Sequence, residues 1–259
     1  MTDQLLNRED REGVAWLTLN RPQAYNALSL GLMETVSDEL DKIAGDRSVR
    51  AVVIAGAGKG FCAGHDLKEL RGTPTKAFYQ ETFKACSRMM LTVVRQPQPV
   101  IARVHGIATA AGCQLLASCD LAVASKTARF GTPGVNIGLF CSTPMVALSR
   151  NVGRKQAMQM LLTGEMIDAE TALSFGLINQ AVPEEDLDGA VEAWADKVKS
   201  KSSHVLKIGK EAFYRQAEMD LEDAYAYTAQ VMVENMLAKD AEEGIDAFIE
   251  KRKPQWQDA

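Results

Sequence analysis

The sequence has no apolar run long enough to cross a membrane and no basic block of the kind that neutralises nucleic-acid phosphates. Its 259 residues carry a formal net charge of −5, with acidic and basic side chains interspersed. These absences predict no membrane span and no nucleic-acid partner. They leave room for a small polyanionic ligand, because a few local lysines and helix N-termini decide such a contact.

Disulfide patterns and targeting segments are also missing. The five cysteines are odd in number, scattered along the chain and form no C-x-x-C pair, which predicts a reducing compartment. Residues 1–11 alternate charged and polar side chains. They show neither the apolar stretch of a secretory signal nor the arginine- and serine-rich, acid-poor composition of a transit peptide. We therefore expect a cytoplasmic protein.

Three common kinds of functional motif are absent. The histidines His65, His105 and His204 lie far apart and have no carboxylate or cysteine neighbours at metal-ligand spacing, so no metal site is expected. No G-x-S-x-G sequence occurs, which disfavours a serine hydrolase. The glycine-rich loop at residues 55–60 lacks the Ser or Thr that follows the lysine of a Walker loop, and it lacks the third glycine of a Rossmann fingerprint. A nucleotide-hydrolysing loop is therefore disfavoured.

Hydropathy patterns predict an α/β fold in the first two thirds of the chain. Apolar residues recur at helical spacing between Ser29 and Ile43 and again at residues 110–119. Short segments rich in β-formers alternate with these helices, and most are continuously apolar, as in strands covered on both faces. The strands are expected at residues 13–19, 49–55, 100–104 and 121–124.

The last third of the chain predicts helices almost exclusively. Residues 221–237 and 241–251 are rich in Ala, Met and Glu, with regularly spaced apolar positions. We expect a core at residues 1–195 that carries the binding site, and a helical oligomerisation subdomain at residues 196–259. Surplus apolar surface on these helices favours burial against another subunit, and an intramolecular lid is the alternative.

Two glycine-bearing loops are candidates for a binding site. Residues 62–67 (CAGHDL) leave a strand and enter a predicted helix, and residues 108–114 (ATAAGCQ) do the same after the strand at 100–104. A helix N-terminus presents unpaired amides at the positive end of the helix dipole. Two such amides aimed at one point would form an oxyanion hole.

Several segments together resemble the enoyl-CoA hydratase/isomerase (crotonase) superfamily. The resemblance spans nearly the whole chain and implies an α/β crotonase-like (ClpP/crotonase) spiral of β-β-α repeats with a C-terminal helical trimerisation region. It also implies a homotrimer or a dimer of trimers. The substrate would be an acyl-CoA, so coenzyme A would enter as part of the substrate and no prosthetic group would be bound. The segments are LNRPQAYNALS, AGHDLKEL, GCQL, CDLAVAS, FGTPGVNIG and AFIEKRK.

The resemblance assigns roles to individual residues. The backbone N–H groups of His65 and Ala111 would hold the thioester oxygen. Ala111 replaces the usual glycine, which is acceptable where φ is negative. Further residues would line CoA, six from the same chain and two from the neighbouring subunit. The six are Gln23, Ala24, Tyr25, Ala63, Asp66 and Leu67, and the two are Phe248 and Lys251.

The sequence departs from the family at two catalytic positions. Hydratases of this family place two glutamates beside a water, whereas this chain has Gln114 and Gly134 there. An amide orients a water but transfers no proton at neutral pH, and glycine has no side chain. Ordinary hydration is therefore expected to be slow or absent.

Two functions stay open. The first is an enzyme that stabilises a thioester enolate and uses another acid or base. Cys141 aligns roughly with the nucleophilic aspartate of dehalogenase-like members, although a buried structural cysteine is the alternative reading. Glu69 and Glu81 are two more carboxylates that could reach the expected cavity, although a solvated surface glutamate is the favoured interpretation of each. The second function is a non-catalytic acyl-CoA-binding or regulatory protein, which the missing glutamates favour.

Overall fold

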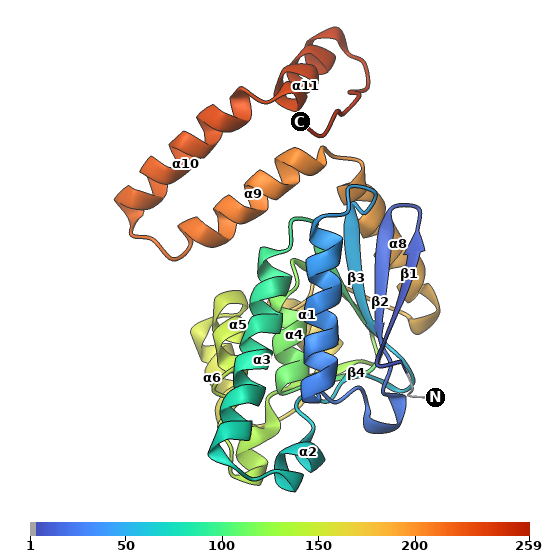
Figure 1. Ribbon diagram of the computed structural model, residues 1–259, viewed down its shortest axis with the longest axis vertical. Coiled ribbons are helices and arrows are strands. Elements are labelled where there is room, and N and C mark those ends of the chain that lie inside the picture. The colour runs from blue at the N-terminus through green and yellow to red at the C-terminus, as the bar shows by residue number, and fades with distance from the viewer. Residues whose placement is uncertain (1–3) are drawn as a thin grey trace.

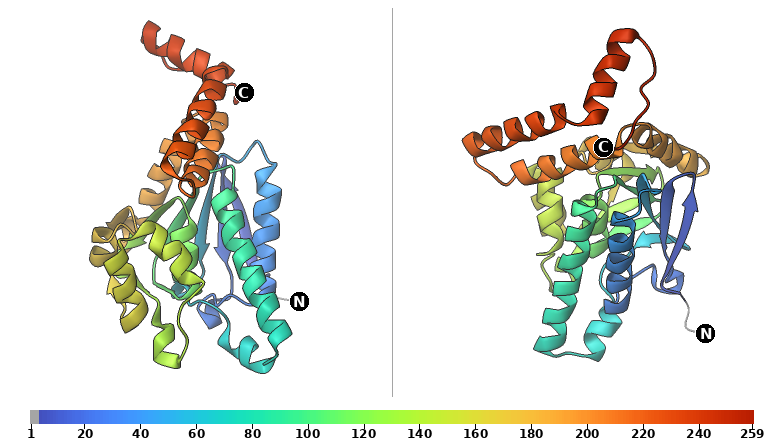
Figure 2. Two further views of the ribbon diagram at one scale, coloured as in Figure 1. Left: turned by 90° about the vertical axis from the view of Figure 1, so that its left-hand side faces the viewer. Right: turned by 45° about the horizontal axis from the view of Figure 1, so that its top comes forward.

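The computed structural model describes residues 4–259, and in this range the chain forms an α/β core from which a helical arm extends (Figure 1). Two sheets, one of six strands and one of four, build the described core. The arm covers residues 203–250 and lies beyond one end of the core in each view (Figure 2).

The larger sheet has the order β1-β2-β3-β5-β7-β10. An antiparallel hairpin, β1 and β2, forms one edge, and the remaining neighbours pair in parallel. The strands are β1 Leu6–Arg11, β2 Val14–Leu19, β3 Ala51–Gly56, β5 Val100–Val104, β7 Leu121–Ser125 and β10 Gln180–Val182. Alternate residues of β3 enter two different apolar clusters, Val52 and Ile54 on one face and Ala51 and Val53 on the other. A strand covered on both faces explains the continuous apolar run in the sequence.

The smaller sheet has the order β4-β6-β8-β9, and β4, β6 and β8 pair in parallel. Its strands are β4 Gly60–Cys62, β6 Ile107–Thr109, β8 Arg129–Gly131 and β9 Ile167–Asp168. Each of β4, β6 and β8 follows a strand of the larger sheet along the chain, and helical structure comes next. This repetition confirms the β-β-α spiral that the family resemblance implied.

Helices cover both faces of the larger sheet. One face packs on α8, through Leu187, Val191 and Ala195, and the opposite face packs on α1, α3 and α4. The core helices are α1 Leu30–Ala44, α2 Leu67–Gly72, α3 Lys76–Arg95, α4 Ala111–Ser118, α5 Pro144–Asn151, α6 Arg154–Thr163, α7 Ala169–Ser174 and α8 Leu187–Lys199. None of the helices described is both long enough and apolar enough to span a membrane.

Local signals set where the helices nearest the site begin. The side chains of Ser29, Asp66 and Thr75 accept hydrogen bonds from the first-turn amides of α1, α2 and α3. Several elements were missed in the sequence, among them the edge strand β1 and the twenty-residue helix α3. Both carry many charged or polar residues on an exposed side, which obscures their apolar periodicity.

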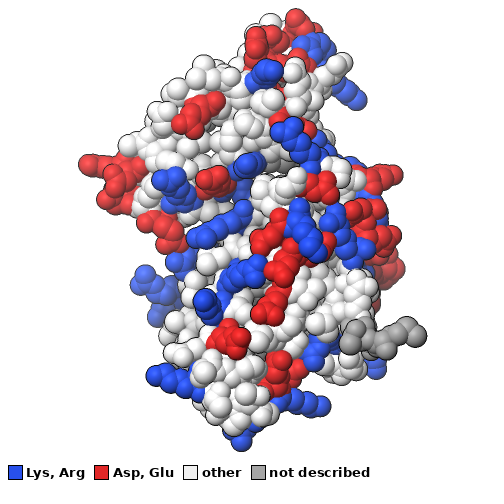
Figure 3. Space-filling view, in the orientation of Figure 1, with Lys and Arg blue, Asp and Glu red and all other residues white. Residues whose placement is uncertain are grey.

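Charges of both signs share the surface. On the face shown in Figure 3, Lys and Arg side chains lie among Asp and Glu side chains. Arg88 of α3, for example, bridges Asp38 and Asp41 of α1 at 2.9 and 2.8 Å. Exposed pairs of this kind contribute little to stability, so they matter here mainly for the charge pattern.

The arm consists of α9 Ser203–Gln216, α10 Leu221–Met236 and α11 Lys239–Glu250. Helices α9 and α10 run side by side, and α11 turns away from them (Figures 1 and 2). Residue 196, where the sequence placed the start of the oligomerisation subdomain, falls within α8. The division at that residue stays a prediction.

A buried ion pair fixes α9 to the core. Lys210 Nζ donates to Asp120 Oδ2 at 2.6 Å and to the Gln98 carbonyl at 3.2 Å, and Tyr214 donates to Asp120 Oδ1 at 3.0 Å. Asp120 also accepts from the Val100 amide at 2.7 Å. Burial lowers the pKa of Lys210, although Asp120 opposes that shift. The carboxylate of Asp120 therefore links α9 of the arm to β5 of the larger sheet and neutralises the ammonium of Lys210.

We predict that Asp120→Ala lowers the free energy of unfolding by about 3–5 kcal/mol, because it leaves the ammonium of Lys210 buried without its partner. Tyr214→Phe, which removes one hydrogen bond to the same carboxylate, should cost about 1 kcal/mol. Urea unfolding at one fixed protein concentration measures both. Equal losses in the two variants would contradict the assigned role of Asp120.

Candidate active site

Two loops of the core meet at the C-terminal end of β4. The Leu28 amide donates to the Gly64 carbonyl at 2.7 Å, and the Asp66 amide donates to the Leu28 carbonyl at 3.0 Å. The Ala63 amide donates to the Tyr25 carbonyl at 3.0 Å. The structure thus brings together the two segments predicted to line CoA from the same chain. The segments are Gln23, Ala24 and Tyr25, in and just after a 3₁₀ turn at Pro22–Ala24, and Ala63, Asp66 and Leu67.

Two side chains hold these loops. Asn26 is fully buried, and its Nδ2 lies 2.9, 2.8 and 3.1 Å from the carbonyls of Ala57, Gly60 and Phe61. Arg21 pairs with Asp66 at 2.7 Å. Burial alone would raise the pKa of Asp66, but the hydrogen bond and charge of Arg21 together with the backbone amides of Glu69 and Lys68 outweigh it, and the pKa is lowered. Asp66 therefore stays ionised while it caps α2.

The two amides predicted to form an oxyanion hole lie on backbones in close contact. Gly64 has a φ of +92°, and a Cβ at this residue would lie 2.9 Å from the Ala110 Cβ and 3.2 Å from the Ala111 nitrogen. Neither the His65 nor the Ala111 N–H donates a hydrogen bond to any residue within 4–259. Two unpaired donors thus lie at helix entrances whose backbones are in close contact.

The peptide before Ala111 has an unusual conformation. Ala110 has φ 49° and ψ −118°, a region that is costly for a residue with a Cβ. Its amide donates to the Gly131 carbonyl at 2.9 Å, and the Thr109 hydroxyl donates to the Ala63 carbonyl at 3.0 Å. Ala111 itself begins α4 with helical backbone, so no glycine is required there. Backbone strain at Ala110 is consistent with a functional orientation of the following amide.

The two positions that depart from the family pattern are both enclosed. Gln114, on α4, is 5% exposed, and its Oε1 lies 3.8 Å from the Cys86 thiol. A Cβ at Gly134 would lie 2.6 Å from the Leu139 carbonyl oxygen and 2.8 Å from the Cys141 sulfur. The present backbone therefore has no space for a side chain at residue 134.

The sulfur and carboxylate candidates from the sequence are poorly placed for proton transfer. Burial raises the pKa of Cys141, which is 7% exposed, and this disfavours the thiolate that a nucleophile needs. Glu69 Oε2 accepts from the Leu30 amide at 2.9 Å and thereby caps α1. Glu81 is exposed on α3.

The side chain of His65 is a feature that the sequence analysis missed. Its ring meets Phe83 edge to face, with 5.2 Å between centroids and 82° between planes. Nε2 is buried without a hydrogen-bond partner, and burial lowers the pKa of the imidazole to about 4. Because the sequence pattern points only to the backbone of residue 65 and α3 was not predicted, no signal placed an aromatic ring against this histidine.

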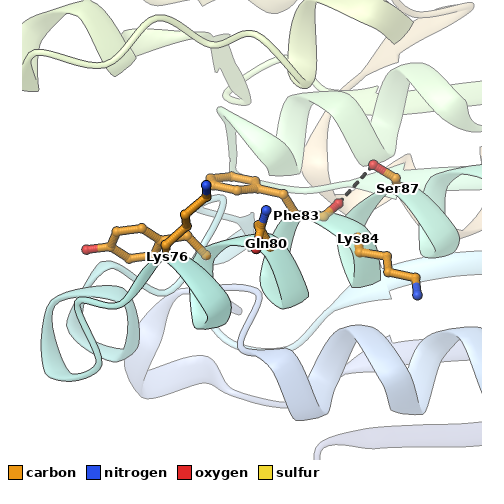
Figure 4. Close-up of a pocket in the computed structure, with 6 residues that line it drawn as sticks. Lys76, Gln80, Phe83, Lys84 and Ser87 are labelled. Carbon is orange, nitrogen blue, oxygen red and sulfur yellow. Dashed lines mark hydrogen bonds between the residues drawn. The ribbon is translucent and has the colours of Figure 1, made fainter.

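Phe83 also lines a hollow of about 710 Å³ along α3. The other lining residues are Lys76, Tyr79, Gln80, Lys84 and Ser87. In Figure 4, Lys76 and Phe83 project from the same side of the helix, and the Ser87 hydroxyl donates to the Phe83 carbonyl at 2.8 Å. The hollow therefore begins one side chain away from the amide of His65.

Phe248 and Lys251 lie far from the other predicted site residues of the same chain. They belong to the end of α11, whereas α2 occupies the opposite end of the molecule (Figure 1). Phe248 is 85% exposed, and Lys251 ends the helix with φ 57°. A role for either residue at CoA therefore requires a second chain.

We predict that Gly64→Ala destabilises the fold by about 1–3 kcal/mol, because φ is positive and the added methyl would press on Ala110 and Ala111. Gly72→Ala is the matched control, since nothing lies within 4 Å of a Cβ there. It should change stability by less than about 0.5 kcal/mol. Thermal unfolding of both variants measures the difference, and a neutral Gly64→Ala would refute the close approach of the two loops.

Known proteins with this architecture share both sequence and structure with the chain. A family model described as enoyl-CoA hydratase/isomerase matches residues 9–259. Rat enoyl-CoA hydratase domain-containing protein 3, mitochondrial, is 46% identical over 98% of this chain and 84% of its own length. A crystal structure of enoyl-CoA hydratase from Mycobacterium smegmatis is 53% identical, with a TM-score of 0.96 over 98% of this chain and 99% of that chain. The human enoyl Coenzyme A hydratase domain-containing protein 3 structure is 44% identical, with a TM-score of 0.94 over 98% of this chain and all of that chain.

The names of the rat and human relatives contradict the expected cytoplasmic location, because both proteins are called mitochondrial. Scattered cysteines indicate only a reducing compartment, which is not unique to the cytoplasm. The N-terminal part of that expectation used residues 1–11, of which residues 1–3 lie outside the described range.

The spiral of β-β-α units, the paired loops and the extent of the similarity all agree. Nearly the whole chain matches the family model, and relatives above 40% identity cover it almost end to end. The chain belongs to the enoyl-CoA hydratase/isomerase family.

Proposed function

We propose that this protein binds an acyl-CoA thioester and stabilises the thioester enolate with the backbone N–H groups of His65 and Ala111. The observation that carries the proposal is the pair of unpartnered amides on backbones held in contact at Gly64. Donors aimed at a developing oxyanion in a largely dry site account for much of the catalysis in acyl chemistry. The names of the relatives support the same substrate class, because the Mycobacterium smegmatis protein is called an enoyl-CoA hydratase and the rat protein an enoyl-CoA hydratase domain-containing protein.

Coenzyme A would bind along the two loops that meet at Gly64. Hydrogen bonds between the loops and the Arg21–Asp66 pair preorganise them, so binding would cost little conformational entropy. The exposed side chains of Gln23, Tyr25 and Leu67 border this surface. No cofactor beyond the thioester itself is part of the proposal.

The complete site would need a trimer or a dimer of trimers. The chain exposes 13912 Å², whereas a compact monomer of this mass exposes about 11,000 Å². Much of the excess belongs to the arm, where large apolar side chains face solvent. They are Phe213, Leu221, Tyr225, Met232, Val233, Met236, Leu237, Ile245, Phe248 and Ile249. Burial of this surface between copies would also bring Phe248 and Lys251 to a neighbour's CoA.

A non-catalytic acyl-CoA-binding or regulatory protein is the second candidate. The enclosed amide of Gln114 and the filled space beside Gly134 favour it, because neither position offers a proton-transfer group. The two candidates agree on binding and differ only in turnover.

Calorimetry with butyryl-CoA and a spectrophotometric assay with crotonyl-CoA separate the candidates. We expect binding, with hydration at least about 100-fold slower than that of a family hydratase with both glutamates, because a positioned proton-transfer group contributes about 10²–10⁴-fold. Fast hydration would refute the claim that Gln114 and Gly134 disable that reaction. Absence of binding would remove both candidates.

A second prediction concerns the neighbour's contribution. Lys251→Asn removes the positive charge, and asparagine tolerates the positive φ of this residue. It should weaken CoA-thioester binding about 10-fold, since a charge-assisted contact to phosphate contributes roughly 1.5–3 kcal/mol and part of this is lost to solvent screening. Lys253→Asn, two residues on, should leave affinity unchanged. Sedimentation should give three or six chains per particle for the native protein and for both variants. A monomeric native protein would argue against a CoA site formed by two chains.

A further inference from the structure

Enolate formation needs a group that accepts the proton from C2 of the acyl chain, and the usual carboxylates are not present in this chain. Cys141 has a raised pKa, Glu69 is engaged at the start of α1, and Glu81 points to solvent. The remaining titratable side chain next to the paired amides is the imidazole of His65.

The imidazole of His65 is positioned by packing rather than by hydrogen bonds. Phe83 holds the ring edge to face, and no hydrogen bond engages either ring nitrogen within residues 4–259. Nε2 is closed off from solvent, whereas Nδ1 is not. In a neutral imidazole one nitrogen carries hydrogen and the other a lone pair. With the hydrogen on the closed Nε2, the lone pair lies on the accessible Nδ1.

The covalent geometry of His65 limits how far its Nδ1 can lie from a substrate bound to its own amide. Nδ1 and the amide nitrogen belong to one residue, so covalent geometry keeps them within roughly 5 Å. A thioester oxygen held by that amide would lie about 2.9 Å from its nitrogen. C2 of the acyl chain is two bonds from that oxygen. These lengths allow a C2 proton to approach Nδ1 of His65 when the thioester oxygen lies on the amide of the same residue.

We propose that the imidazole of His65 removes and returns the C2 proton of the bound acyl-CoA, in place of the missing glutamates. The proposal rests on the thioester-binding function proposed above. It concerns the side chain of the residue whose amide was already assigned to the oxyanion hole.

The proton transfer needs no further reactant. The C2–H bond breaks, its electron pair forms the C1–C2 double bond of the enolate, and the carbonyl electrons move to the oxygen held by the two amides. The proton passes to Nδ1 and gives an imidazolium. Return of a proton to C2 restores the thioester, and return to C4 of a 3-enoyl group moves the double bond into conjugation.

The surroundings keep the imidazole neutral at physiological pH. The lowered pKa of about 4 results from burial, and it equals the usual pKa of a glutamate. Burial is the one cause given by these surroundings, since Asp66 and Glu69 on α2 are occupied by Arg21 and by the Leu30 amide, and the charged side chains that line the hollow along α3 are Lys76 and Lys84. The base form should therefore persist as the pH falls and be lost only near pH 4.

Proton exchange at C2 of butyryl-CoA in D₂O, followed by NMR, tests the proposal. A saturated acyl chain neither hydrates nor isomerises, so deuterium uptake reports enolate formation alone. We expect exchange by the native protein and a loss of at least about 100-fold in His65→Gln, which retains the backbone N–H but cannot transfer a proton. Calorimetry should show butyryl-CoA affinity within about threefold of native. His204→Gln, on α9, is the matched control and should exchange at the native rate.

The outcomes are distinct. Exchange by His65→Gln at the native rate overturns the role of the imidazole, and so does a native protein that binds butyryl-CoA without exchange. Failure of the native protein to bind overturns the proposed function as well. If His65→Gln does not fold, His65→Phe and the native pH profile decide. A rate that is constant from pH 6 to 8 supports His65, whereas a rise near pH 6.5 or above pH 8 contradicts it.

Discussion

The contact between Gly64 and the peptide that joins Ala110 to Ala111 is the constraint on which the rest of the site depends. A Cβ at residue 64 would lie within about 3 Å of both the Ala110 Cβ and the Thr109 oxygen, so only glycine lets these two backbones approach. Two repeats of the spiral each contribute one of the loops, since β4 leads to Gly64 and β6 leads to Ala110. The parallel pairing of β4 with β6 brings both loops to the same end of the smaller sheet, and each loop carries an amide without a partner.

Two polar side chains, Arg21 and Asn26, hold the loops at this end of the smaller sheet, and both belong to the short segment LNRPQAYNALS. Asn26 is buried and satisfies three carbonyls of the Gly-rich loop, and Arg21 links the first loop to the cap of α2 through Asp66. Arg21 and Asn26 lie on either side of the proposed CoA-lining residues Gln23–Tyr25 and are not themselves assigned to that surface. Their effect is to hold the loop carbonyls inward, which leaves the amides of the neighbouring peptides free for a ligand.

Much of the fold could be predicted from the sequence, because buried strands and amphipathic helices leave periodic patterns. The strand expected at residues 49–55 was observed at Ala51–Gly56, and the helix expected at residues 110–119 was observed at Ala111–Ser118. The site was predictable where it depends on backbone, through the resemblance of its loops to a known family. It was not predictable where it depends on packing. His65 and Phe83 are distant in sequence, so no local pattern predicts their contact. The lack of space beside Gly134 results from the turn that brings Leu139 and Cys141 against it, and this too is not visible in the sequence.

The two departures from the family pattern both lie in enclosed surroundings. Once residue 134 has no side chain, the Leu139 carbonyl and the Cys141 sulfur occupy the adjoining space, and the Gln114 amide is left with a weak contact to a thiol. The region is therefore less charged than one with two carboxylates, and charge separation within it is correspondingly costly. A neutral imidazole with no ionic partner is compatible with such surroundings, because it carries no charge until it accepts a proton. The positive charge would then arise beside the enolate that compensates it, so the ion pair would form in one step and collapse when the proton returns.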